Sequence, residues 1–528
     1  MPEKPSLLDL ARPAAALLAA ALAAHPGAAD PVPRFLDRAA ALPVEHRYTG
    51  GWEHFVGGGV AVLDCEGRGF PSLVVAGGVA PARLLRNVTE GAGAPIRFAL
   101  GDFPALTGVT GIWPLDIDGD GVLDLAVLRV GANLLLRGLG DCGFEDATAD
   151  WGLAPAEAWS TAFAATWEPG FDRPTLAIGN YVDRANPDGP FFACDAGELH
   201  RWDAKQDRYL PLRLEPGFCA LSMLISDWTR TGRPDLRISN DRHYYVRGGS
   251  EQMWRLDELR PLGPADGWEE ISLWGMGIAS RDITGNGYPD VFLTSMADQV
   301  LMLNEGGGVL RMAPFELGTT AHRPWFGDDG RPSTGWHAEW ADVTNSGRAD
   351  LFIAKGNVDQ MPSNAMADPN NLLIQRPDGR FDEVADRAGI ATTARARGAA
   401  LADLNRSGRL DLVVVNRRAP LELWENATRG AGRWLQLLPR MEGPNAFAVG
   451  AWVEVETAAG VQRQEVTVGG GHGGGQAGPL HFGLGPATQA RIRVLWPDGT
   501  ASDWRTTPAD RRLELRATSP ALTLRDLP

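Results

Sequence analysis

The chain has 528 residues, of which 44% are hydrophobic, and its formal net charge is −16 at pH 7. This length exceeds that of one ordinary domain unless it is divided among repeats, and no apolar run approaches the roughly 18 residues that span a membrane, so we expect no membrane span. The acidic residues lie in short Asp-rich clusters, which argues against nucleic acid as a partner and favours a bound cation.

The first segment, residues 1–29, has an alanine-rich stretch after Lys4 and Arg12 and ends in small residues. This pattern is typical of a signal peptide, which would place the mature protein in the periplasm or outside the cell. Glu3 and Asp9 offset the positive charge expected at its start. An alanine-rich helix that stays in the mature protein is therefore the alternative.

Residues 45–430 carry an Asp-rich pattern that recurs about every 50 to 60 residues, a period typical of propeller blades. Its clearest copy is DIDGDGVLDL, which begins at Asp116. Each copy lies between two short apolar or small-residue strands, so we predict strand-to-strand turns and a seven-bladed β-propeller. The copies begin at Asp64, Asp116, Trp167, Asp227, Asp282, Asp342 and Asp403.

The spacing within the clearest copy is that of a loop that binds a hard cation such as Ca²⁺. Oxygen side chains stand at positions 1, 3, 5 and 9, a backbone carbonyl is available at position 7, and glycine at position 6 allows a sharp bend. The predicted ligands are Asp116, Asp118, Asp120, the carbonyl of Val122, and Asp124. Four carboxylates would repel one another without a cation, so we expect the tightest site here.

Four further loops keep aspartate at positions 1 and 9 but place neutral oxygens between them, which predicts weaker binding. Their predicted ligands are Asp227, Thr229, Thr231 and Asp235; Asp282, Thr284, Asn286 and Asp290; Asp342, Thr344, Ser346 and Asp350; and Asp403, Asn405, Ser407 and Asp411. The copy at Asp64 has Arg68 at position 5 and Ser72 at position 9, and the copy at Trp167 has Pro169, Phe171 and Thr175 at positions 3, 5 and 9, so both are expected to be empty. The sequence thus predicts up to about five calcium ions.

The chain has four cysteines, none of them in a C-x-x-C pair. We expect the disulfides Cys65–Cys142 and Cys194–Cys219, because each would link neighbouring repeats. Four buried thiols are the alternative.

The strand before the sixth loop carries His337 and Glu339 where most other copies have small residues. Residues two apart on a strand face the same side, so the pair could act in acid–base catalysis at the mouth of the central channel. Alternatively, the two side chains hydrogen-bond to each other and fill a gap between blades. Further ligand-binding candidates at this mouth are His54, Trp274, Met276, Trp336 and Arg397.

Residues 434–516 alternate between short strands and turns, which predicts a small β-sandwich or barrel. The glycine-rich run at residues 469–475 surrounds His472 and is too flexible for a strand. We predict a mobile surface loop for it rather than a phosphate-binding loop, because no helix pattern follows it.

The DxDGDGxxDL loops resemble the FG-GAP or VCBS repeats of integrin-type propellers. Near the end of the chain, the motifs RWLQL, AVGAWVEV, LHFGLG and VLWPDG closely resemble an ASPIC/UnbV domain. The combination, over roughly residues 45–516, resembles the cartilage-acidic-protein family. The resemblance implies an exported calcium-binding propeller that acts in adhesion or recognition, and it implies no general biochemical activity.

Three functions remain open at this point. The chain could be a recognition module for a protein or a glycan, or a calcium-dependent hydrolase, lyase or cyclase that uses His337 as general base and Glu339 to orient it. It could also be a purely structural module. No Ser-His-Asp elbow, Walker loop or H-E-x-x-H motif is present to favour an enzyme, so the recognition module is our first hypothesis.

Overall fold

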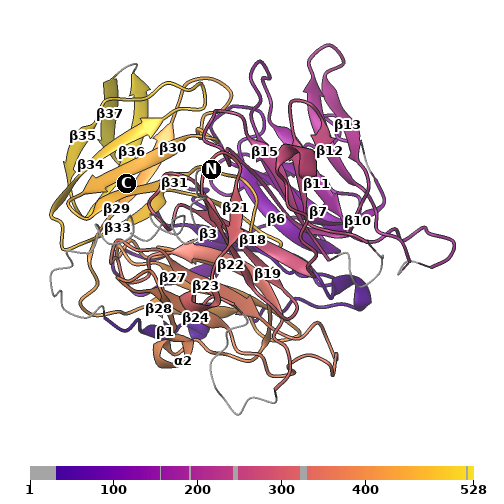
Figure 1. Cartoon of the computed structure of the whole chain (residues 1–528), viewed down its shortest axis with the longest axis horizontal. Coiled ribbons are helices and arrows are strands. Elements are labelled where there is room, and N and C mark those ends of the chain that lie inside the picture. Colours follow the sequence, from indigo (N-terminus) through magenta and orange to yellow (C-terminus); the bar gives the residue numbers. More distant parts are fainter. Residues whose placement is uncertain (1–30, 155, 190–191, 242–247, 321–329, 519–520) are drawn as a thin grey trace, which may run out of the picture.

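The computed structural model describes residues 31–154, 156–189, 192–241, 248–320, 330–518 and 521–528, and these fold mainly into strands (Figure 1). The all-β fold predicted from the sequence is confirmed. The helical segments are short turns within this described part: η1 (Ala39–Ala41), η2 (Trp52–His54), η4 (Pro264–Asp266), η5 (Phe315–Leu317) and α2 (Ala385–Ala388).

Most of the chain forms antiparallel sets of four strands. The first three sets are β2 (Val60–Leu63), β3 (Ser72–Val75), β4 (Arg83–Asn87) and β5 (Phe98–Leu100); β6 (Val109–Leu115), β7 (Asp124–Gly131), β8 (Leu134–Gly138) and β9 (Phe144–Asp146); and β10 (Ala158–Thr166), β11 (Thr175–Asn180), β12 (Gly197–Asp203) and β13 (Arg208–Leu214). The second and third sets are joined, since β10 also pairs with β7.

The next sets follow the same order along the chain. They are β14 (Ala220–Ser226), β15 (Asp235–Asn240), β16 (Gln252–Arg255) and β17 (Arg260–Pro261); β18 (Gly275–Arg281), β19 (Asp290–Ser295), β20 (Val300–Asn304) and β21 (Leu310–Met312); β22 (Gly335–Ala341), β23 (Asp350–Lys355), β24 (Asn371–Gln375) and β25 (Phe381–Glu383); and β26 (Arg395–Ala402), β27 (Asp411–Arg417), β28 (Glu422–Asn426) and β1 (Phe35–Asp37).

The first strand of each set contacts the first strand of the next, and β26 of the last set contacts β2 of the first. This is the radial arrangement of a β-propeller, and we interpret the sets as seven blades. The strand β1 comes from the start of the described chain and pairs with β28, so the two ends of the propeller region together close the last blade. The propeller therefore includes residues before position 45, where the sequence placed its start.

The inner strands of the blades are buried on both faces because neighbouring blades pack against them. Every residue of β6 and of β14 is buried, whereas the outer strand β21 is largely exposed. This explains why β6 and β14 consist mainly of small or apolar residues and show no polar alternation.

The C-terminal domain is a sandwich of two sheets (yellow in Figure 1). One sheet contains β33 (Leu480–Gly485), β29 (Arg433–Arg440), β36 (Arg511–Thr518) and β37 (Ala521–Asp526); the other contains β31 (Gly460–Glu465), β30 (Trp452–Thr457), β34 (Gln489–Leu495) and β35 (Arg505–Pro508). The two-residue strand β32 (Gln476–Ala477) leaves this domain and pairs with β2 of the first blade. The predicted sandwich is present, and its last strand extends beyond residue 516.

Both predicted disulfides, Cys65–Cys142 and Cys194–Cys219, are present, and no free cysteine is found among the described residues. The first joins the turn after β2 to the turn after β8, so it links the first two blades. The possible signal peptide at residues 1–29 lies outside the described residues. Within the described part of the chain, no helix is both long enough and apolar enough to cross a membrane.

Candidate metal loops and the filled central channel

Each Asp-rich loop joins the first and second strands of its blade, and its first aspartate organises the turn. In the sixth blade, the backbone N–H groups of Ser346 and Gly347 donate to the two carboxylate oxygens of Asp342, at 2.8 and 2.7 Å. Asp403 and Asp227 accept the equivalent pairs of bonds in their own loops. The first aspartate therefore fixes the loop backbone around its own carboxylate.

The aspartate at position 9 ties the loop to the rest of the blade. The Ile117 N–H donates to Asp124 Oδ2 at 2.6 Å, and the Gly138 N–H donates to Asp124 Oδ1 at 2.8 Å. Asp350 and Asp411 accept the corresponding bonds in their blades. These bonds place the carboxylates at both ends of the loop in position before any ion binds.

The loop at Asp116 gathers the most negative charge. One ligand oxygen from each of Asp116, Asp118 and Asp120 lies within 4.8 Å of the others. Asp118 Oδ1 has no hydrogen-bond partner among the described residues, and Arg137 Nε lies 3.2 Å from Asp118 Oδ2. Burial, reinforced by the neighbouring aspartates, raises the pKa of Asp116 to about 6 and that of Asp124 to about 8. A divalent cation would stabilise the ionised carboxylates, so this donor set fits Ca²⁺.

The other four loops also contain oxygens suited to a cation. The buried oxygens that lack a hydrogen-bond partner in the described part of the chain lie in three of these loops and are Asp282 Oδ1, Thr344 Oγ1, Asn405 Oδ1 and Ser407 Oγ. In the remaining loop, Asp235 Oδ1 forms an ion pair with Arg255 Nε at 3.4 Å. Burial and the nearby Asp342 carboxylate raise the pKa of Asp350 well above its usual range. Buried unpaired oxygens beside such carboxylates fit a cation as the missing partner.

Several predicted ligands in these loops bond elsewhere. Thr229 and Thr231 share a hydroxyl hydrogen bond of 2.8 Å, and Thr284 Oγ1 donates to Asp290 Oδ2 at 3.3 Å. Asn286 Nδ2 donates to a backbone carbonyl outside its loop. These bonds leave lone pairs on the oxygens, but the oxygens are neutral, so we rank these loops below the loop at Asp116, whose middle ligands are carboxylates.

The sandwich domain covers the face of the propeller that carries these loops. Its side chains reach the loops of four successive blades, and each contact involves a loop residue or its backbone. The contacts are Glu465 Oε1 with the Asp227 N–H (3.1 Å), Arg463 Nη1 with Asp282 Oδ2 (3.2 Å), His481 Nε2 with Asn345 Oδ1 (2.7 Å) and Gln436 Nε2 with Asp403 Oδ2 (2.8 Å). The guanidinium of Arg463 therefore neutralises part of the charge of Asp282 from the second domain.

The glycine-rich run at residues 469–475, called the channel segment below, passes from the sandwich domain into the centre of the propeller. It is not the mobile surface loop that the sequence predicted, because residues 470–474 are buried and bond to the inner strands. The Gly470 N–H donates to Met223 O at 2.6 Å and the Gly471 N–H to Ile278 O at 2.7 Å. Further along, the carbonyl of Gly473 accepts from the Ile112 N–H at 3.0 Å.

His472 lies at the centre of the channel segment. Its backbone N–H donates to His337 Nδ1 at 3.1 Å, and its ring stacks edge-on against Trp336 with 5.1 Å between ring centroids. The Gly57 N–H donates to His472 Nε2 at 3.0 Å, so the ring proton lies on Nδ1 and donates to Met276 O at 3.0 Å. The neutral ring thus bonds to two blades while the backbone bonds to a third.

His337 and Glu339 both bond to the segment that fills the channel or to the residue that follows it. His337 Nδ1 accepts from His472, so its Nε2 carries the proton and faces Glu339 Oε2 at 3.4 Å. Gln476 Nε2 donates to Glu339 Oε1 at 2.6 Å, and the Leu401 N–H donates to Glu339 Oε2 at 3.1 Å. These contacts fit the hypothesis that the two side chains fill a gap between blades better than they fit the hypothesis of a catalytic pair.

Three of the other residues expected at the channel mouth lie beside the same segment: Met276 and Trp336 contact His472, and Arg397 stacks on Trp336. His54, Met276, Trp336 and Arg397 are buried, and Trp274 is half-buried. The Arg397 guanidinium stacks 3.9 Å from the centre of the Trp336 ring, and its Nε donates to a backbone carbonyl at 2.6 Å. These side chains support the filled channel instead of lining an open one.

Replacing His337 by alanine should lower the free energy of unfolding by about 1–3 kcal/mol, because the buried His472 N–H loses its acceptor. Urea unfolding of the variant and of the wild type measures this difference. An unchanged unfolding free energy would show that the contact between His337 and the channel segment does not stabilise the fold.

Stability should also fall in acid because of His472. Burial, together with the nearby charge of Arg397, lowers the pKa of His472 to about 3, whereas the unfolded chain has the ordinary value near 6.5. The stabilising contribution of the neutral ring is complete above pH 6.5 and is lost progressively as the pH falls toward 3, by roughly 1 kcal/mol per pH unit. Urea unfolding at pH 7 and pH 5 should therefore show a smaller decline for His472→Asn than for the wild type; equal declines would contradict this assignment.

Comparisons with known proteins agree with this domain organisation. Residues 342–414 match the family model of the FG-GAP-like repeat, and residues 441–521 match that of ASPIC and UnbV. Cartilage acidic protein 1 of Mus musculus is 26% identical over 163 residues, which are 30% of this chain and 25% of that protein. The Xenopus tropicalis protein of the same name is 31% identical over 109 residues, 20% of this chain and 17% of its own length. The chain thus spans about a quarter of the length of the curated relatives it matches.

Among solved structures, BBS1N in complex with ARL6DN aligns with a TM-score of 0.44 and 11% identity over 76% of this chain and 99% of its own. The BP39L lectin from Burkholderia pseudomallei aligns with a TM-score of 0.43 and 13% identity over 71% of this chain and 97% of its own. The two family models and the curated relatives confirm the resemblance drawn from the sequence: parts of the chain match an FG-GAP-like repeat and an ASPIC and UnbV domain, and the chain is similar to the cartilage acidic proteins over about 30% of its length.

Proposed function

We propose that this chain is an exported binding module in which calcium stabilises the Asp-rich loops and the uncovered face of the propeller binds a protein or a glycan. The observation that carries the proposal is that the sandwich domain occupies the loop face and the channel segment fills the centre. The open face of the propeller is therefore the one formed by the connections at the opposite ends of the strands.

The direction of the strands identifies the residues of this open face. Strand β26 begins at Arg395 and runs toward Asp403, which contacts the sandwich domain, while β27 returns and ends at Arg417. Arg395 and Arg417 therefore lie at the end of the blade that forms the open face, and so does Arg418, which follows β27; Arg418 is exposed and Arg395 half-buried, whereas Arg417 is buried beneath them. All three guanidiniums lie 3.2–3.5 Å from Asp359 Oδ1.

These charges favour an acidic group on the ligand. Three arginines share one carboxylate, so positive charge is in excess at this place on a chain whose formal net charge is −16. Arginine binds carboxylates and sulfates through paired N–H donors. The two disulfides support export, since such bonds persist in oxidising compartments.

The test is a binding screen of the full-length protein against a glycan array and an extracellular protein array, with calcium and with a chelator. Any ligand found is then titrated against Arg418→Glu on the open face and Arg525→Glu on the sandwich domain, both of which change an exposed arginine. We expect binding to weaken only in Arg418→Glu. Binding that survives this change and is lost in Arg525→Glu would place recognition on the sandwich domain and contradict the proposal.

A further inference from the structure

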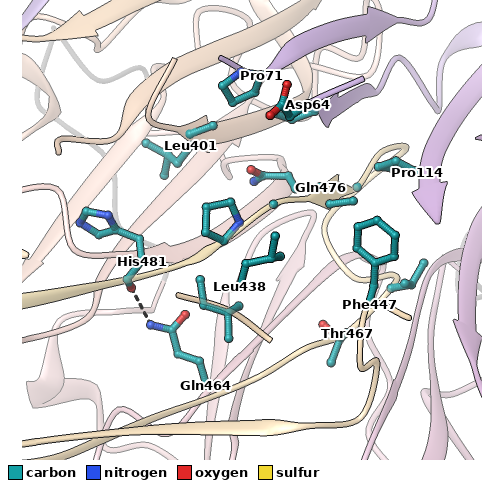
Figure 2. A pocket seen from close by; sticks show the side chains of 18 of the residues that line it. Asp64, Pro71, Pro114, Leu401, Leu438, Phe447, Gln464, Thr467, Gln476 and His481 are labelled. Atoms are coloured by element: carbon teal, nitrogen blue, oxygen red, sulfur yellow. Dashed lines mark hydrogen bonds between the residues drawn. The ribbon is translucent and has the colours of Figure 1, made fainter. Parts of the chain in front are cut away.

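A cavity of 760 Å³ lies between the loop face of the propeller and the sandwich domain (Figure 2). Its walls come from both domains: Leu401 lies on the propeller side, and Leu438, Phe447 and His481 lie on the sandwich side. Ligand sites in proteins commonly enclose about 300–1,000 Å³, with mostly apolar walls and a few placed polar groups. The size and the mixed lining of this cavity are those of a site for a small molecule.

The side chain of Arg281 favours an anionic ligand in the cavity. It is the last residue of β18, lines the cavity, and has only 8% of its surface exposed. Among the described residues, no hydrogen bond or ion pair is formed by its guanidinium, although the carboxylates of Asp342, Asp350 and Asp282 act on it from a distance. A buried guanidinium without hydrogen bonds is costly, and an oxyanion in the cavity would supply them.

The neighbouring cavity residues do not supply this partner. Glu465 accepts bonds from Ser226 and from the Asp227 N–H, and Gln464 Nε2 donates to His481 O at 2.6 Å (Figure 2). The polar groups of these residues are thus already engaged, whereas the guanidinium of Arg281 is not. The cavity therefore offers the unpaired guanidinium of Arg281 beside apolar walls.

We propose that the cavity between the domains binds a small organic anion, with the oxyanion (carboxylate, sulfate or phosphate) on Arg281 and the apolar part against Leu401, Leu438 and Phe447. This site is separate from the open face, so a ligand on one face and a ligand in the cavity can be present together. Because both domains form its walls, the bound anion also stabilises their contact.

The probe for this site is 8-anilinonaphthalene-1-sulfonate, which combines a sulfonate with an apolar ring system. We expect the folded, calcium-loaded protein to bind one equivalent with a rise in dye fluorescence. Arg281→Met should weaken this binding about ten-fold to a hundred-fold, as expected when a charge-assisted hydrogen bond is lost. Thr467→Phe, which keeps the arginine and fills the cavity, should abolish it.

Arg491→Met is the matched control, because Arg491 is exposed and pairs with Glu456 outside the cavity. Melting curves and bound calcium are measured for every variant, so that loss of dye binding is compared only between folded proteins. Equal dye affinity in the wild type and in Arg281→Met overturns the proposal, as does wild-type protein that binds no dye. Displacement of the dye by acetate, sulfate or phosphate supports an oxyanion site, and failure of all three to displace it also overturns the proposal.

Discussion

Gly59→Ala should destabilise the protein by on the order of 3 kcal/mol, because a methyl group at this position would overlap the carbonyl of Gly473 in the channel segment. Both partners are backbone, so neither can move aside as a flexible side chain would. We expect the variant to melt at a lower temperature and the channel segment to exchange its amide hydrogens faster.

Gly51→Ala is the control for the loss of glycine itself. A methyl group at Gly51 would meet no atom within 4 Å, and Gly51 lies in the same first part of the propeller. This variant should melt like the wild type. If Gly59→Ala also melts like the wild type, with unchanged hydrogen exchange at residues 469–475, the channel segment does not occupy the place described here.

Removal of calcium should lower the melting temperature of the wild type by several degrees. An ion bound only by the folded loop stabilises the fold by RT ln(1 + [L]/Kd), about 2.7 kcal/mol at one hundred times Kd. Differential scanning calorimetry in chelator and in excess calcium measures the effect, with magnesium as the control for ionic strength. An unchanged curve, after metal analysis has confirmed removal, would mean that calcium does not stabilise the fold.

The loops, the disulfides and the sandwich could be predicted because each depends on features close together in the sequence. The position-9 aspartate, for example, begins the second strand of its blade in five of the seven copies, so the spacing of the pattern sets both the turn and the strand. The cysteine pairing followed from the order of the repeats, because adjacent repeats become adjacent blades.

The filled channel could not be predicted from local patterns, because it depends on contacts between residues 469–475 and strands hundreds of positions earlier. A signal was nevertheless present in the inner strands. Gly59, Gly111, Gly277 and Gly398 stand at equivalent positions, and a methyl group at any of them would come close to another backbone atom. In the sequence, these glycines are among the small residues that other copies carry at the position of His337. In the structure, they make room for the channel segment.

The closing strand of the propeller was missed for a different reason. Strand β1 has only three residues, and nothing in its sequence indicates a partner near residue 424. Its pairing depends on the closure of the ring, which brings the two ends of the propeller together. The same closure explains why the sequence placed the start of the propeller too late.

A calorimetric titration of the chelated protein with calcium tests whether the Asp-rich loops bind the ion and whether the loop at Asp116 binds it most tightly. Asp120→Ala is the decisive variant, because Asp120 is exposed and, among the residues that the structure describes, its side chain bonds only to the Val122 N–H of the same turn, so that its loss should not disturb the fold. We predict several binding phases for the wild type and loss of the tightest phase in Asp120→Ala, with the others unchanged. Absence of calcium binding by the wild type would contradict calcium sites in the Asp-rich loops, and a tightest phase that survives in Asp120→Ala would contradict the loop at Asp116 as the tightest site.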